Sequence, residues 1–241
     1  MIYFLLLLLL AGCAVSSSPN ATTITSPTKV VLTTSDGKTI AGSYYSGISR
    51  TGGIIFLHML NKDRHTYDSL ARKLNKAGLS VIAIDLRGHG ESSGIWREFT
   101  DIDFVRMILD VKAAKQYLLQ QKVDANNIGI VGASIGANLA LRLGVEDASI
   151  KYIVLLSPGL DYRGVKTDDV IHQYMGGLLL VASKEDTYSS STVQKLYDAS
   201  VSKDKEIKLY DKLGHGTDIF IANPDTEQFV VNWVLTRKKI I

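Results

Sequence analysis

The stretch GIVGASIGANLAL, from Gly129 to Leu141, decides how the rest of this sequence is interpreted. A β-branched apolar run comes first, Ser134 then stands between two glycines, and a run of good helix formers follows. This order predicts a strand, a sharp turn that carries Ser134, and a helix. A Gly-x-Ser-x-Gly match arises by chance in roughly one chain of this length in ten. Gly90–Gly94 (GESSG) fits the same pattern, so the motif alone does not assign a nucleophile.

The segments on either side of this stretch predict an α/β architecture. Residues 29–37 and 39–46 alternate like a hairpin that turns at Asp36-Gly37. Apolar runs of strand length follow at 52–60, 79–86, 127–133, 152–158, 176–183 and 206–211. Helices are expected over 68–77, over about 102–122 after Thr100, and after Asn223-Pro224. The fold class is therefore a mostly parallel sheet of about eight strands with helices on both faces.

Composition indicates one globular domain and argues against nucleic-acid binding. The chain has 241 residues, of which 46% are hydrophobic and 21% charged. Its net charge of +3 comes from 27 basic and 24 acidic residues, which form no basic stripe. No internal repeat is visible.

The first thirteen residues, MIYFLLLLLLAGC, differ sharply from the rest. Such an apolar run is typical of a signal peptide, here residues 1–12, and is too short to span a bilayer. Its end, Leu10-Ala-Gly-Cys13, resembles the lipobox of bacterial lipoproteins, which implies lipid attachment at Cys13 and an extracytoplasmic, membrane-anchored protein. The run lacks the usual preceding Lys or Arg, so a plain secretory signal or an uncleaved anchor are the alternatives.

Residues 13–28 are rich in Ser, Thr and Pro and nearly uncharged, which predicts a flexible tether before a domain at 29–241. Cys13 is the only cysteine, so the chain has no disulfide framework and no cysteine-based metal site.

The surroundings of the two serines favour Ser134 as the nucleophile. Ser134 lies between a predicted strand and a predicted helix, whereas Ser92 lies in a stretch that reads as a plain loop. A serine nucleophile needs a base, and the base needs a carboxylate that holds its tautomer. Asp186 follows a later strand, with Glu185 as the rival acid, and His215 follows the strand after that. These partners appear in the order serine, acid, histidine.

With these residues the chain resembles the α/β-hydrolase superfamily over essentially residues 29–241. The matching residues are Gly132–Gly136, Asp186, the Gly-His-Gly at 214–216, and the loop Asp85–Ser92. The resemblance implies an α/β-hydrolase fold, with Ser134 as nucleophile, His215 as general base and acid, and Asp186 as the orienting carboxylate. It also implies an oxyanion hole made by the backbone N–H groups of Ile135 and Met59, with Leu60 as the alternative to Met59.

The remaining candidate residues have simpler interpretations. We expect His58 to be structural and hydrogen-bonded, and His89 to brace the loop in which it lies. His65 and His172 carry no partner signal, and no spacing of His, Asp or Glu resembles a metal site. The Met59 side chain could line an acyl pocket. Four other large side chains could either line a pocket or pack in the core or on the surface: Trp96, Tyr162, Tyr174 and Met175.

The predicted function is a carboxylic ester hydrolase that works through an acyl-enzyme and requires no cofactor. Only about sixteen residues, 160–175, separate two of the predicted strands, which leaves no room for a multi-helix lid. This favours small or short-acyl esters, or acyl groups carried on a polymer. A peptidase, thioesterase or acyltransferase with the same triad is the alternative within enzymes, and a non-catalytic surface lipoprotein is the alternative of another class.

Overall fold

The structure is a computed structural model, and it describes residues 26–48 and 50–237. The expected signal peptide 1–12, Cys13 and most of the expected tether 13–28 lie outside these residues. No helix within the described ranges combines the length and apolarity needed to cross a membrane.

The elements follow the expected alternation of strands and helices. The strands of the main sheet are β1 Thr28–Thr33, β2 Thr39–Tyr45, β3 Gly53–Leu57, β4 Ser80–Ile84, β5 Ile128–Ala133, β6 Ile150–Leu156, β9 Gly177–Ser183 and β10 Lys205–Tyr210. A separate short hairpin is formed by β7 Asp161–Tyr162 and β8 Val165–Lys166. The α-helices are α1 Asp68–Lys76, α2 Asp101–Arg106, α3 Ile108–Gln120, α4 Ile135–Glu146, α5 Thr187–Ala199, α6 Asp218–Ala222 and α7 Pro224–Arg237. Short 3₁₀ turns span Arg64–Tyr67, Trp96–Glu98 and Ile171–Gln173.

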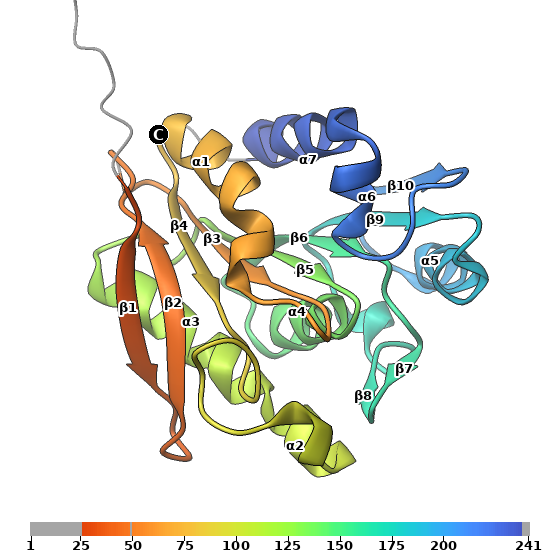
Figure 1. Ribbon diagram of the computed structural model, residues 1–241. Coiled ribbons are helices and arrows are strands. Elements are labelled where there is room, and N and C mark those ends of the chain that lie inside the picture. Colours follow the sequence, from red (N-terminus) through yellow and green to blue (C-terminus); the bar gives the residue numbers. More distant parts are fainter. Residues whose placement is uncertain (1–25, 49, 238–241) are drawn as a thin grey trace, which may run out of the picture.

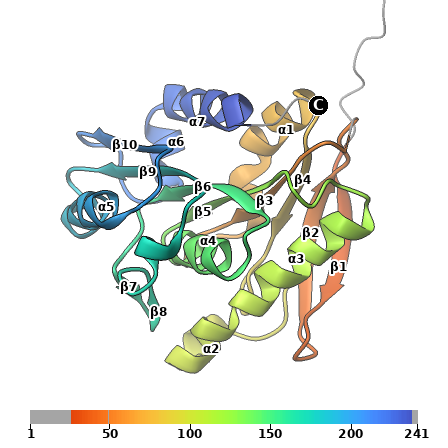
Figure 2. The same ribbon diagram turned by 180° about the vertical axis from the view of Figure 1, so that it is seen from behind.

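The eight strands form one sheet in the order β1-β2-β4-β3-β5-β6-β9-β10. The expected hairpin β1–β2 is antiparallel, and β2 pairs antiparallel with β4, whereas the pairs from β4 to β10 are parallel. Helices α1 and α7 cover one face of the sheet, and α3, α4 and α5 cover the other (Figures 1 and 2). The expected fold class is therefore confirmed.

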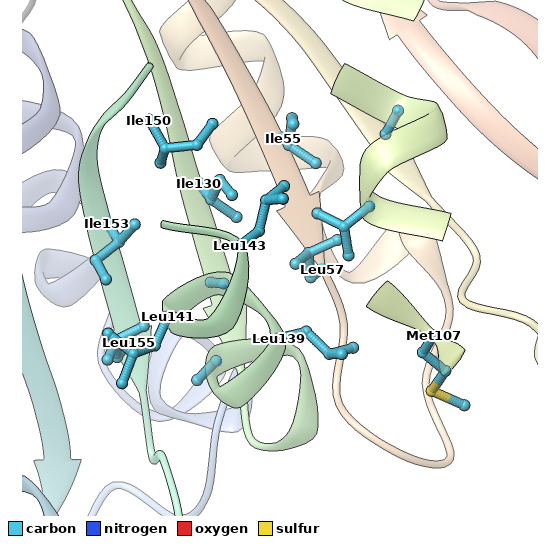
Figure 3. Close-up of a cluster of buried hydrophobic side chains, with 14 of the residues drawn as sticks. Ile55, Leu57, Met107, Ile130, Leu139, Leu141, Leu143, Ile150, Ile153 and Leu155 are labelled. Carbon is cyan, nitrogen blue, oxygen red and sulfur yellow. The ribbon is translucent and has the colours of Figure 1, made fainter. Parts of the chain in front are cut away.

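Each face of the sheet has its own hydrophobic core, because alternate side chains of a strand point to opposite faces. Ile55 and Leu57 of β3 belong to the core beneath α3 and α4, whereas Ile54 and Phe56 belong to the core beneath α1 and α7. Figure 3 shows Leu139 and other leucines of α4 close to the side chains of β3 and β6. The sheet is therefore buried between two helix layers.

The prediction of one continuous helix over 102–122 is wrong, because the structure has two helices there. It begins after Thr100, whose capping box with Asp103 is formed, but it breaks into α2 and α3 at Met107. There the N–H of Met107 donates to Phe104 O and the N–H of Asp110 donates to Met107 O. These i to i+3 bonds tighten the turn at Met107, a change that the pattern of apolar residues does not reveal.

The carboxyl ends of the parallel strands lie at one edge of the sheet, where α/β proteins form their sites. The loops that leave this edge carry Met59 after β3, Ser134 after β5, Asp186 after β9 and His215 after β10. The candidate residues are therefore gathered by the topology.

Candidate active site

Ser134 occupies the sharp turn between β5 and α4. Its φ of 54° and ψ of −121° lie where a residue with a side chain is strained. The turn is held by the Ser134 N–H, which donates to Leu156 O at 2.8 Å. The side chain at this position is 7% exposed, so it lies just beneath the surface of the edge.

The two glycines around Ser134 are required by close backbone approach. A Cβ at position 132 would overlap the carbonyl of Gly136, and a Cβ at 136 would overlap the carbonyl of Leu57 at the end of β3. The turn thus brings the start of α4 against β3. The N–H of Ile135, at the first position of α4, has no acceptor one turn back within the helix. The expected strand, turn and helix are all present.

Asp186 and His215 are in direct contact. His215 Nδ1 lies 2.6 Å from Asp186 Oδ2, and Asp186 Oδ1 accepts a hydrogen bond from the Ser189 N–H at the start of α5. A carboxylate in this position holds the proton on Nδ1 and leaves Nε2 free to accept one. The rival acid Glu185 instead accepts the N–H of Gly214 at 2.7 Å. Both acids therefore support the loop between β10 and α6, residues 211–217, which carries His215 and is called the histidine loop, but only Asp186 contacts the imidazole.

The histidine loop packs against the residue that precedes Ser134. Gly216 has a φ of 58°, and a Cβ there would lie 3.4 Å from Ala133 Cβ and 2.6 Å from Met59 Sδ. The Gly216 N–H donates to Ser157 Oγ at 2.9 Å. His215 is thus held next to the turn of Ser134, although its direct contact is with Asp186.

The loop after β3 is fixed by a buried histidine. His58 is 0% exposed; its Nδ1 lies 2.8 Å from Met59 O, and its Nε2 accepts the N–H of Leu86 at 3.0 Å. These two contacts define the neutral tautomer with the proton on Nδ1. Burial, together with the neighbouring His89, lowers the pKa of His58 to about 4. The structural interpretation of this histidine fits its surroundings.

The Met59 side chain is held between the loop after β3 and the loop that carries His215. It is 6% exposed and packs beneath the histidine loop at Gly216. The bond between His58 and the Met59 carbonyl also fixes the plane of the next peptide, and with it the direction of the Leu60 N–H.

Tyr162 is the pocket candidate that the fold brings to the site. Its hydroxyl lies 3.1 Å from Ser189 Oγ and also interacts with Ser134, and its ring is perpendicular to that of His215 with centroids 6.3 Å apart. Burial raises the pKa of this tyrosine, and hydrogen bonds with Ser189 and Ser134 act in the opposite direction. Sequence reasoning did not single out Ser157 or Ser189, since nothing in the sequence marks these serines as partners of the site.

The other candidates lie elsewhere. Ser92 Oγ donates to Asp85 O at 2.6 Å and accepts the N–H of Ala41, so this serine ties its loop to β2. His89 stacks on Trp96 with a ring separation of 5.5 Å. Three further residues have no contact with Ser134, Asp186 or His215 among the printed interactions: Tyr174 is buried in the core, Met175 is 81% exposed, and His65 contacts Asp68. Among the residues that the structure describes, no group of three or more His, Cys, Asp and Glu side chains could hold a metal ion.

Comparison with known protein families gives a match over a segment that contains Ser134. The profile of the family described as serine aminopeptidase, S33, matches residues 49–176, which is more than half of the chain. The chain belongs to this family. The matched segment includes Ser134 and ends before Asp186 and His215. Membership places the chain in the α/β-hydrolase superfamily and supports a hydrolase activity.

The similarity to curated relatives covers only part of each relative. The thiohydrolase aneE of Aspergillus aculeatus is 28% identical over 149 residues, which is 60% of this chain and 46% of that protein. The AB hydrolase superfamily protein YisY of Bacillus subtilis is 32% identical over 128 residues, covering 48% of this chain and 44% of that protein. The chain thus matches less than half the length of each of these two relatives.

Solved structures share the fold. The Pyrococcus furiosus esterase Pf2001 superposes with a TM-score of 0.76 at 23% identity, covering 88% of this chain and 93% of that one. The dienelactone hydrolase of Anabaena variabilis gives a TM-score of 0.74 at 17% identity, covering 89% and 100%. Together with the sheet order, these likenesses confirm the α/β-hydrolase fold.

Proposed function

We propose that this protein is a serine hydrolase that cleaves carboxylic esters with small or short acyl groups. The observation that carries the proposal is the 2.6 Å contact between His215 and Asp186, which lies beside the strained turn of Ser134. A carboxylate, an imidazole and a serine in this order are the components of a catalytic triad.

In the proposed reaction, Nε2 of His215 takes the proton of Ser134 as Oγ attacks the ester carbonyl. Asp186 stabilises the imidazolium that forms, and the N–H groups of Ile135 and Met59 donate to the developing oxyanion, with Leu60 as the alternative to Met59. His215 then protonates the leaving alcohol. Water repeats the cycle on the acyl-enzyme, and the chemistry requires no cofactor.

The short segment between β6 and β9 supports a small or accessible substrate. It consists of the hairpin β7–β8 and one 3₁₀ turn at Ile171–Gln173. A multi-helix lid over this edge is absent from that described segment, so acyl groups displayed on a polymer could also approach.

The cellular location belongs to the same proposal. We infer a signal peptide at 1–12, lipid attachment at Cys13, and a tether to residue 28 that holds the hydrolase domain outside the cytoplasm at a membrane; secretion without an anchor is the alternative. Mass spectrometry of the mature N-terminus tests this directly. A diacylglycerol-modified Cys13 is expected, and an intact Met1 or an unmodified Cys13 would contradict it.

Peptides and thioesters are the second class of substrate, together with acyl transfer to an alcohol. The family description names an aminopeptidase and one relative is called a thiohydrolase, which favours retaining both possibilities. Kinetics on p-nitrophenyl esters, thioesters and aminoacyl amides separates them. Faster turnover of amides or thioesters than of esters would replace the ester proposal.

Labelling with a fluorophosphonate tests the site itself. Wild type should be labelled at Ser134 and hydrolyse p-nitrophenyl acetate. Ser134→Ala should show neither labelling nor hydrolysis, and the matched control Ser92→Ala should behave like wild type. Unlabelled wild type would favour the non-catalytic lipoprotein, and labelling at Ser92 would overturn the assignment.

The two acids are tested by kinetics. Asp186→Asn should lose about 10³–10⁴-fold in kcat because His215 loses its tautomer, whereas Glu185→Gln should lose less than about tenfold.

A further inference from the structure

Tyr162 stands beside Ser134 on the hairpin that connects β6 toward β9. The hairpin turns at Arg163 and Gly164, both with positive φ, and places the tyrosine hydroxyl 3.1 Å from Ser189 Oγ. The ring lies edge-on to His215. This tyrosine therefore packs against the proposed base and against Ser189, whose N–H bonds to Asp186, without being part of the triad.

The hairpin is tied at both ends to the helix that begins at the nucleophile. Asn138, one turn after Ser134 in α4, is 0% exposed and accepts the N–H of Gly159 at 3.1 Å. Its amide nitrogen donates to Val165 O at 2.7 Å. One buried amide therefore sets the position of the hairpin relative to Ser134, so Tyr162 is held in place rather than free to swing aside.

Gly159 makes room for the tyrosine ring. A Cβ at this position would lie 2.7 Å from the ring of Tyr162 and 2.8 Å from that of Tyr188. The two rings pack edge to face, with centroids 5.6 Å apart and an interplanar angle of 71°. The Tyr188 hydroxyl accepts the N–H of Asp161 at 3.1 Å, which joins α5 to the hairpin. Together the two tyrosines form a wall on the β6 and β9 side of Ser134.

The sheet order decides which part of a substrate meets this wall. Strands β3 and β6 flank β5 on opposite sides, so the proposed oxyanion donors at Met59 and Ile135 lie on the β3 side and the wall lies on the other. The leaving oxygen must face Nε2 of His215, which protonates it. His215 also lies on this side of β5, with its ring 6.3 Å from that of Tyr162. We assign the alcohol to His215 and the acyl chain to the space beside the Tyr162 ring, and esters that vary in only one of these two parts tell the assignments apart.

We propose that Tyr162 is a specificity-determining residue, whose ring limits the length of the acyl chain that Ser134 can accept. This inference rests on the proposed function and deepens it. The ring sets the limit, and the hydroxyl contributes its bond to Ser189.

The test measures kcat/KM for p-nitrophenyl acetate, butyrate and octanoate with Tyr162→Ala and with the matched control Tyr162→Phe. Tyr162→Ala should raise the ratio of octanoate to acetate at least tenfold, because each methylene that gains an apolar contact is worth about fourfold. Tyr162→Phe keeps the ring and should stay within threefold of the wild-type ratio. In a series of acetate esters with longer alcohols, Tyr162→Ala should leave the order of preference unchanged.

An unchanged octanoate-to-acetate ratio in Tyr162→Ala would overturn the proposal, and so would a changed preference in the alcohol series. Circular dichroism checks folding, and Tyr162→Leu, which shortens the wall with less loss of packing, takes the place of an unfolded alanine variant with the same expected direction. Fluorophosphonate labelling separates the two levels. If wild type is not labelled, the proposed serine hydrolase function is wrong. If the Tyr162 variants are labelled but keep the wild-type octanoate-to-acetate ratio, only the proposed role of Tyr162 is wrong.

Discussion

At the scale of the residue, His58 shows how an ionisable side chain can serve as a fixed structural group. It is fully buried, bonds to the carbonyl of Met59, and accepts the N–H of Leu86, so it joins the ends of β3 and β4. Burial disfavours its charged form and lowers its pKa to about 4. The loop that carries the proposed oxyanion donor therefore depends on a neutral imidazole.

The lowered pKa of His58 predicts that the free energy of unfolding depends on pH. The unfolded histidine titrates at a pKa of 6.5 and the folded one at about 4, so between these values the unfolded state binds more protons. The stabilising contribution is fully present above pH 6.5 and is lost as the pH falls toward 4, by about 3 kcal/mol. Urea unfolding at intervals from pH 4 to 8 measures it. His58→Gln should show a shallower slope in that window, and parallel slopes would contradict the assignment.

At the scale of the element, the position of α4 depends on contact between backbones. The start of the helix lies against the end of β3 because positions 132 and 136 lack side chains. The same contact places the N–H of Ile135 beside the loop of Met59. The glycines of the motif therefore serve two purposes, since they allow the turn and they bring the two proposed oxyanion donors together.

Gly136→Ala tests this role. The added Cβ would overlap the carbonyl of Leu57 and push α4 from β3, at a cost of about 1–3 kcal/mol in the free energy of unfolding. Ester hydrolysis should also fall by at least tenfold, because the N–H of Ile135 moves. Gly42→Ala is the control, since its nearest contact is a side-chain methyl at 3.1 Å, and it should cost less than about 1 kcal/mol. Equal losses in both variants would argue against the close packing of α4.

At the scale of the whole molecule, a buried ion network joins segments that are distant in sequence. Arg87, in the loop after β4, donates through Nε to Asp110 of α3 at 2.9 Å and through Nη1 to Asp36 in the β1–β2 turn at 2.7 Å. Arg87 and Asp110 are 3% and 0% exposed. The edge hairpin, the sheet and the helix layer are thus connected through one guanidinium group.

Removing one partner of this network should destabilise the fold strongly. Asp110→Ala removes the fully buried one of the two carboxylates that pair with Arg87, leaves the more exposed Asp36, and should lower the free energy of unfolding by about 3–5 kcal/mol. The control is Lys184→Ala, which breaks the exposed pair with Asp211 and should cost less than about 1 kcal/mol. Urea unfolding at pH 8 compares the two. A loss below 1 kcal/mol for Asp110→Ala would show that this network does not hold the layers together.

Local residue order was sufficient to predict the main features of the fold. The six apolar runs and the alternating hairpin predicted the eight strands of the sheet, and the spacing of the glycines predicted the turn at Ser134. The break at Met107 was missed, because a switch from i+4 to i+3 bonds leaves the apolar periodicity nearly unchanged.

Neighbouring residues were enough to predict the succession of strands, the turn at Ser134, and the order in which serine, acid and histidine follow the strands, whereas helices α5 and α6 were not predicted. The three-dimensional arrangement shows in addition that Asp186 rather than Glu185 contacts His215, that Met59 packs beneath the histidine loop, and that Tyr162 lies against Ser189 and His215. These contacts join loops from different strands. Their distances follow from sheet order and helix packing, which no short stretch of sequence contains.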